Sequence, residues 1–152
     1  IHNPPMSDIL QRFLFEHAPI RGEFVQLSAT WQAVTGRHNY PPPLRRALGE
    51  LLAAGALLAA TLKFDGRLLL QIHGDGPVKL VVVECGSGHA MRATAKWEGE
   101  VPEGSLRTLL GNGRFAISLL PDSGQQGYQG IVDLEADSIA AAFEHYMATS
   151  EQ

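Results

Sequence analysis

Cysteine is almost absent from this 152-residue sequence, which contains only Cys85. One thiol can form neither an internal disulfide nor a multi-cysteine metal cluster, and such cysteine usage is typical of a reducing cytoplasm. Cys85 follows Glu84 at the end of an apolar run, with no nearby cation in the sequence that would lower the thiol pKa. We therefore expect Cys85 to be a packed, unreactive thiol.

Metal-ligand spacing is missing as well. None of the six histidines belongs to a His-x-x-x-His or Glu-paired pattern, and none has a cysteine partner. These residues are His2, His17, His38, His73, His89 and His145. The sequence predicts no metal site and no cofactor in this chain.

The sequence also lacks a long hydrophobic run and a basic excess. Its longest uncharged apolar run, residues 51–62, is shorter than the ~20 residues that a membrane-spanning helix needs. Twelve Lys and Arg against sixteen Asp and Glu give a net charge of −4, and the cations are scattered, which argues against a nucleic-acid partner. No signal-peptide pattern opens the chain. These features predict a cytoplasmic protein with neither a membrane nor a nucleic-acid partner.

What remains is the composition of one globular domain, with 45% hydrophobic and 18% charged residues. Residues 1–5 precede Met6 and are interpreted as additions from cloning. Residues 6–152 then form the domain.

Residues 10–27 have the alternating pattern of two strands, interrupted by a turn at residues 19–22. Ser28 is expected to cap a short helix by accepting hydrogen bonds from its free amides. Gly36 is expected to end that helix in the left-handed conformation.

The prolines at residues 41–43 predict the start of a long helix, because proline lacks only an amide that the first turn leaves unpaired. The apolar stripe of this helix consists of Leu44, Leu48, Leu51, Gly55, Leu58 and Leu62. No charge occurs between Glu50 and Lys63, so the second half should be covered on most sides. Leu58→Ala should then cost roughly 2–5 kcal/mol, and Arg45→Ala less than about half a kcal/mol if that side chain is solvated.

The pattern alternates after the long helix, with glycine turns between the apolar runs, as in an antiparallel meander. Strands are expected at residues 67–73, 78–84, 91–97, 115–120 and 128–134. A short helix is expected at residues 105–110 and a last helix from residue 139 almost to 152, with acidic residues before it. The apolar face of the last helix is Ile139, Phe143, Tyr146 and Met147. The predicted fold is α+β, with antiparallel sheets packed around a long, largely buried central helix and further short helices.

Three glycine turns invite a catalytic interpretation, namely residues 74–76, 86–89 and 111–113. The turn at Ser87 lacks the Gly-x-Ser-x-Gly form and the strand-to-helix elbow of a hydrolase nucleophile. The other two do not join a strand to a helix, as a phosphate-binding loop does. They are better explained as tight turns that need positive backbone angles, and no catalytic residue is assigned.

Three stretches resemble the redox-regulated heat-shock holdase family, the thirty-three-kilodalton heat-shock proteins. The first is Arg12-Phe13-Leu14-Phe15-Glu16 with Arg21-Gly22-Glu23. The second runs from Tyr40-Pro41 through the long helix to Ala60-Thr61-Leu62-Lys63-Phe64-Asp65-Gly66, and on to Gln71 and Gly74-Asp75-Gly76-Pro77. The third is Leu110-Gly111-Asn112-Gly113 with Tyr128-Gln129-Gly130-Ile131-Val132. Their combination and order are specific.

The resemblance implies a cytoplasmic, ATP-independent chaperone that binds unfolding proteins under oxidative stress and forms intertwined homodimers. It also implies a C-terminal module in which four cysteines hold zinc and form disulfides on oxidation. Cys85 matches none of these cysteines, so this chain is interpreted as the truncated N-terminal domain without linker, zinc module or switch. The client-binding residues are unknown, and we expect a homodimer completed by sheet edges or exchanged elements.

Two alternatives stay open. One is a small-molecule enzyme with a cleft near the glycine turns and His73 or His89. The other is a fragment that serves only as a dimerisation scaffold.

Overall fold

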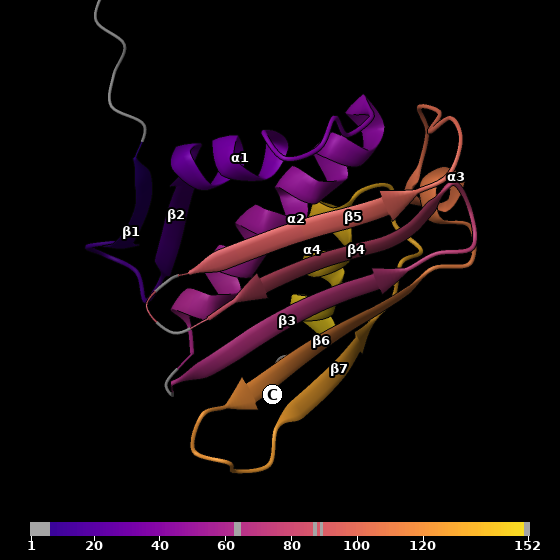
Figure 1. The fold of residues 1–152 in the computed structure, drawn as a ribbon. Helices are drawn as coiled ribbons and strands as arrows, with labels where there is room; N and C mark the ends of the chain where they lie inside the picture. Colours follow the sequence, from indigo (N-terminus) through magenta and orange to yellow (C-terminus); the bar gives the residue numbers. More distant parts are fainter. Residues whose placement is uncertain (1–6, 63–64, 87, 89, 151–152) are drawn as a thin grey trace, which may run out of the picture.

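A computed structural model describes residues 7–62, 65–86, 88 and 90–150. The described chain forms two antiparallel sheets and four helices, which confirms the predicted α+β class. One sheet has two strands and the other has five, and the long helix α2 lies between the small sheet and the large one (Figure 1). The interpretation of residues 1–5 concerns a part of the chain outside the described residues.

The small sheet is a hairpin of β1 (Asp8–Leu14) and β2 (Arg21–Leu27). Its turn is closed by a hydrogen bond from the Phe15 amide to the Ile20 carbonyl, 2.9 Å long. The two predicted strands around a turn are thus confirmed. This hairpin has no strand partner in the large sheet among the described residues, and β1 lies at the outer side of the molecule (Figure 1).

Helix α1 (Ser28–Thr35) forms as predicted, but both of its predicted ends are wrong in detail. Ser28 does not cap it. Instead the Asp8 carboxylate of β1 accepts hydrogen bonds from the amides of Ala29 (2.9 Å) and Thr30 (3.2 Å). Gly36 has φ −74°, an ordinary right-handed value. Tertiary contact between β1 and α1 therefore supplies a cap that local sequence does not encode.

Helix α2 (Pro42–Ala60) begins at the proline run and packs the first part of its predicted stripe, Leu44 to Gly55, on the inner face of the large sheet. Its fully buried residues include Leu44, Leu48 and Leu51. A Cβ added at Gly55 would lie 3.2–3.3 Å from the side chains of Val83, Cys85 and Leu70, so glycine permits this close approach. The central position of α2 is confirmed.

The large sheet has the strand order β5-β4-β3-β6-β7. Its strands are β3 (Gly66–His73), β4 (Val78–Cys85), β5 (Met91–Trp97), β6 (Arg114–Pro121) and β7 (Tyr128–Val132). The predicted meander of β3 to β5 is confirmed, whereas β6 returns to pair with β3 at the centre. All five strands match predicted runs within a few residues.

The two remaining helices also match the sequence pattern. Helix α3 (Leu106–Leu110) is capped by the Ser105 hydroxyl, which accepts from the Thr108 amide at 3.3 Å. Helix α4 (Ile139–Ser150) packs beside α2. The Glu50 carboxylate of α2 accepts a hydrogen bond from the Ile139 amide (3.3 Å), so α2 caps its neighbour.

Candidate functional site

The titratable residues that could carry catalysis or hold a metal are dispersed. His17, His38, His73 and His145 are all exposed and lie on separate parts of the fold. His2, Ser87 and His89 lie outside the described residues. Among the residues that the structure describes, no three His, Cys, Asp or Glu side chains gather as a metal site would require. A catalytic cleft at His73 therefore gains no support from the geometry.

Cys85 is packed against α2 with only 3% of its surface exposed. Burial, together with the charge of Glu84, raises the pKa of its thiol to about 11, because both disfavour the thiolate. The expected packed, unreactive thiol agrees with this environment.

Zinc, which the resemblance assigns to a four-cysteine module, does not fit the residues of this chain. A structural zinc site needs four ligands in tetrahedral arrangement. The sequence offers one cysteine, and that thiol is buried.

The two glycine turns at residues 74–76 and 111–113 meet and stabilise each other. The Asp75 and Gly76 amides donate to the Leu110 carbonyl at 2.9 and 3.0 Å, and Asp75 accepts from the Asn112 amide at 2.7 Å. Gly111 has the expected positive φ of 65°. The same expectation is wrong for Gly74, Gly76 and Gly113, none of which has a positive φ. Glycine is nevertheless required at Gly74, because a Cβ there would lie 2.4 Å from the Val78 carbonyl oxygen. The hydrogen bonds of these turns hold the fold together.

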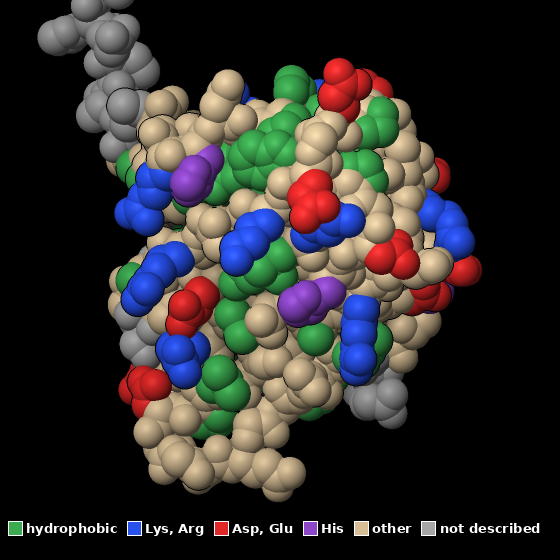
Figure 2. Space-filling model, turned by 45° about the vertical axis from the view of Figure 1, so that its right-hand side comes forward, with side chains coloured by type: hydrophobic (Ala, Val, Ile, Leu, Met, Phe, Trp, Pro, Cys, Tyr) green, Lys and Arg blue, Asp and Glu red, His purple; other side chains and the backbone are tan. Residues whose placement is uncertain are grey.

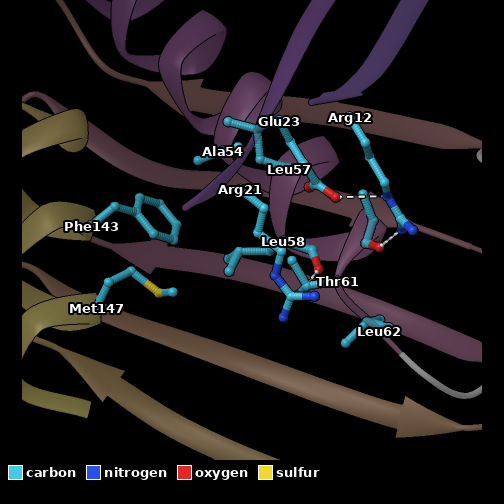
Figure 3. Close-up of a pocket in the computed structure, with 12 residues that line it drawn as sticks. Arg12, Arg21, Glu23, Ala54, Leu57, Leu58, Thr61, Leu62, Phe143 and Met147 are labelled. Carbon is cyan, nitrogen blue, oxygen red and sulfur yellow. Dashed lines mark hydrogen bonds and ion pairs between the residues drawn. The ribbon is translucent and has the colours of Figure 1, made fainter. Parts of the chain in front are cut away.

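A groove lies between the hairpin, the C-terminal half of α2 and α4, with a volume of about 550 Å³ (Figure 3). We call it the α2–α4 groove. Its apolar lining consists of Ala54, Leu57, Leu58, Ala60, Leu62, Phe143 and Met147. Arg12, Arg21 and Glu23 of the hairpin form its polar rim.

Two residues that line the groove are less buried than the sequence predicts. Leu58 was expected in a closed core, yet it is only half-buried because the hairpin does not close over this side of α2. Met147 was expected on the buried face of the last helix, but it is 53% exposed on the groove wall. The second half of α2 is therefore covered on fewer sides than its apolar sequence predicts.

The side chain of Arg12 connects the hairpin to the C-terminal end of α2. The Arg12 guanidinium donates to the Ala60 carbonyl and forms an ion pair with Glu23 at 2.9 Å (Figure 3). The cation lies where the carbonyl end of a helix is electronegative, which favours this contact. The hairpin is thus held at the rim of the groove while its tip stays exposed.

The hairpin carries most of the exposed large apolar side chains of the described chain. These are Ile9, Leu10, Phe13, Leu14, Phe15, Ile20 and Phe24. The rings of Phe13 and Phe15 lie 6.2 Å apart, and a Cβ on Gly22 would meet the Phe13 ring. Single exposed apolar residues are common on soluble proteins, but a concentration of seven on one hairpin is typical of a protein-binding site.

The outer face of the large sheet is the second surface of interest. Half-buried Leu69, Leu80 and Val82 lie at its centre, and Arg92 and Lys96 are exposed on β5 beside them. Figure 2 shows apolar side chains interspersed with Lys and Arg on the face that it presents. Apolar side chains are therefore open to solvent at several places, and no catalytic groups converge among the described residues.

These surfaces are not apparent from the sequence, because an apolar side chain that binds a partner looks the same as one that fills a core. The available signal was the apolar character of both faces of residues 9–15, which belong to a strand that pairs on one side only within the described part of the chain. No described helix meets the length and hydropathy of a membrane span.

Comparison with known proteins gives a consistent result. A family model described as Hsp33 protein matches residues 8–152. The chain is similar to the 33 kDa chaperonin of Chromobacterium violaceum, with 52% identity over 95% of this chain and 50% of the relative. It is also similar to the 33 kDa chaperonin of Methylobacillus flagellatus, with 53% identity over 97% of this chain and 50% of that relative.

A solved structure has the same fold. The crystal structure of the 33 kDa chaperonin, a heat shock protein 33 homologue, from Thermotoga maritima superposes with a TM-score of 0.80 at 24% identity, over 95% of this chain and 51% of that one. The chain spans about half the length of the curated relatives that it matches.

Proposed function

This chain belongs to the Hsp33 protein family, and from that premise we propose that it is the client-binding part of an ATP-independent holdase chaperone. Its clients are unfolding proteins whose apolar segments become exposed under oxidative stress. The proposal includes a cytoplasmic location, a homodimeric assembly and the absence of enzymatic activity. The redox switch that the resemblance assigns to four cysteines has no place on a chain with a single cysteine.

The observation that carries the proposal is the amount of apolar surface left open on a folded chain. The hairpin exposes seven large apolar side chains, and the α2–α4 groove adds half-buried leucines beside it. An unfolding client presents apolar side chains that gain free energy when they leave water, at roughly 25 cal/mol per Å² of buried apolar surface. This contact needs neither nucleotide nor a catalytic group.

The test is suppression of aggregation. Reduced, guanidinium-unfolded lysozyme is diluted into buffer with or without the chain, without nucleotide, and its light scattering is followed. We expect stoichiometric amounts of the chain to lower the scattering at least twofold. Unchanged scattering would contradict the proposed function for this chain.

A matched pair of variants locates the activity. Met147→Glu places a charge on the exposed wall of the groove, whereas Ala148→Glu places the same charge on the same helix outside the groove lining. Desolvating a carboxylate opposes apolar binding, so Met147→Glu should weaken suppression and Ala148→Glu should not. Equal effects would exclude the groove as a client site.

A further inference from the structure

We propose that the hairpin of β1 and β2 is a hinged flap, which rotates away from α2 about Leu27 and Ser28 and uncovers apolar surface for clients. Such a flap would regulate the client-binding surface of the proposed function, on which this part of the proposal rests. Its evidence is the way in which the hairpin is attached to the rest of the described chain.

The hairpin is tied to its neighbours by few contacts. Strands β1 and β2 pair only with each other among the described residues, and every residue of β1 is exposed. Leu27 ends β2 and Ser28 begins α1, so a single peptide link joins the flap to the helix. A two-stranded sheet is marginally stable by itself, and elements with few buried contacts open at a lower free energy than the core.

The contact between the hairpin and α2 is incompletely packed. A cavity of about 370 Å³ lies between them. Leu10 and Val25 line it from the hairpin, Ala56 and Ala59 from α2, and Cys85 from the large sheet. Atoms that border a void lose the dispersion contacts that close packing supplies. Separating the hairpin from α2 therefore costs less free energy than separating two fully packed elements.

Polar contacts at the two ends of β1 keep the flap closed. Asp8, which lies opposite Leu27 in the hairpin, accepts hydrogen bonds from the first amides of α1. Arg12 donates to the Ala60 carbonyl at the end of α2 (Figure 3). Asp8 and Arg12 are both exposed, so water can replace these hydrogen bonds and their net contribution is modest. They hold the hairpin in place without making its position permanent.

Opening the flap would enlarge the apolar surface along the C-terminal half of α2. The hairpin forms one side of the cavity and, through Arg12 and Glu23, the polar rim of the α2–α4 groove. Moving the hairpin away would join the two hollows over Ala56, Leu58 and Ala59. A client segment would then bury more apolar surface than either hollow accepts alone, which strengthens its binding.

The thiol of Cys85 is a natural reporter of the opening. It is the only thiol of the chain, it lies beneath the hairpin, and it is 3% exposed. Burial also raises its pKa to about 11, so the closed form reacts slowly. Labelling by dithiobisnitrobenzoate is followed in urea concentrations below the unfolding transition, and the unfolded chain gives the intrinsic labelling rate.

We expect Cys85 to be labelled at least about tenfold faster than global unfolding allows, because the flap opens while the core stays folded. The urea dependence of labelling should be less than about half that of global unfolding, since only part of the surface becomes exposed. Labelling that follows global unfolding in both rate and urea dependence would overturn the proposal.

Variants of the polar contacts test what holds the flap. Arg12→Ala and Asp8→Ala should each raise the labelling rate at least about fivefold, because each removes one attachment. Asp8→Asn keeps an oxygen that can accept from the amides and should change the rate less. Arg46→Ala is the matched control, since it removes an exposed ion pair between α2 and Glu103. Equal rates in Arg12→Ala and Arg46→Ala would contradict the flap.

Hydrogen exchange locates the opening. In the parent chain, the hairpin and the first turn of α1 should exchange faster than β4 and β5, because the flap moves while the large sheet stays paired. Amides of β5 that exchange as fast as Cys85 is labelled would show that β4 and β5 separate instead, which overturns the flap.

Aggregation assays separate the flap from the proposed function. Arg12→Ala should suppress lysozyme aggregation at a molar ratio about twofold lower than the parent chain, because more of it is open. Faster labelling with unchanged suppression would overturn the role of the flap in client binding. Absence of suppression by both chains would contradict the holdase function, whereas labelling would still decide whether the flap opens.

Discussion

At the scale of single residues, the environment of each leucine on α2 decides what it contributes. Leu48 is fully buried against the large sheet, whereas Leu58 lies half-buried at the α2–α4 groove. Identical side chains on one helix therefore face a closed core and an open groove.

We expect Leu48→Ala to lower the free energy of unfolding by ~2–5 kcal/mol, because it leaves a cavity in a closed core. Leu58→Ala should cost about 1–2 kcal/mol, since water can enter the space that it leaves. Urea unfolding of both variants measures the difference. Equal losses would mean that the groove is closed in solution.

Arg45 shows that an exposed charge can still make a specific contact. Its guanidinium lies 5.9 Å from the centroid of the Trp31 ring. Cation–π contacts at exposed sites contribute about 0.5–1 kcal/mol. Arg45→Ala should therefore cost slightly more than the substitution of a purely solvated arginine.

The thiol of Cys85 makes the free energy of unfolding depend on pH in the alkaline range. Its pKa is about 11 in the folded chain, above the ordinary value of 9.0. The unfolded chain therefore releases this proton first, so the stabilisation is fully present below pH about 9 and is lost as pH rises towards 11.

We expect the parent chain to lose up to about 2 kcal/mol more stability than Cys85→Ala between pH 8 and pH 11. Urea unfolding at several pH values measures this, and the difference between the two chains cancels the titration of other groups. Parallel pH curves would contradict the raised pKa.

At the scale of elements, the starts of α1 and α4 are capped by groups from distant parts of the chain. Asp8 of β1 holds the start of α1, and Glu50 of α2 holds the start of α4. These carboxylates join neighbouring elements while satisfying free helix amides.

Asp8→Ala should destabilise the chain by about 1–2 kcal/mol, the usual cost of removing a helix cap. Hydrogen exchange should become faster in both β1 and α1, because Asp8 joins them. Ser28→Ala is the control at the position that local sequence favours as the cap, and it should change stability by less than about half a kcal/mol. A larger effect of Ser28→Ala would reinstate the local cap.

At the scale of the whole molecule, the single cysteine limits redox behaviour. A chain with one thiol has no dithiol to close within itself, and that thiol is buried here. Responses to zinc and to oxidant therefore test whether the chain lacks the switch.

We expect dialysis against a mild chelator to remove zinc completely, since one thiol and dispersed histidines cannot form a tetrahedral site. Atomic absorption of the dialysed chain measures this. One zinc ion per chain after dialysis would refute it.

Peroxide should leave the far-ultraviolet circular dichroism of the chain within a few per cent of its starting value, because no disulfide can form inside it. The buried Cys85→Ala variant serves as the control for oxidation of that thiol. A large spectral change in the parent chain alone would show that Cys85 controls folding.

The sequence by itself determined the elements and their order. Alternation of apolar residues predicted all seven strands, the proline run predicted the start of α2, and the helical stripe predicted which side of α2 meets the sheet. These features depend on neighbouring residues and on chain geometry, so a linear pattern encodes them.

Only the tertiary structure decided which apolar residues stay open and which distant groups meet. Leu58 and Met147 have the pattern of core residues, yet they line a groove because the hairpin packs beside α2 without closing over it. Ser28 has the pattern of a cap, yet Asp8 arrives from 21 residues away and takes its place. Burial and capping are properties of the partner that reaches a residue, and that partner is fixed only when the elements pack.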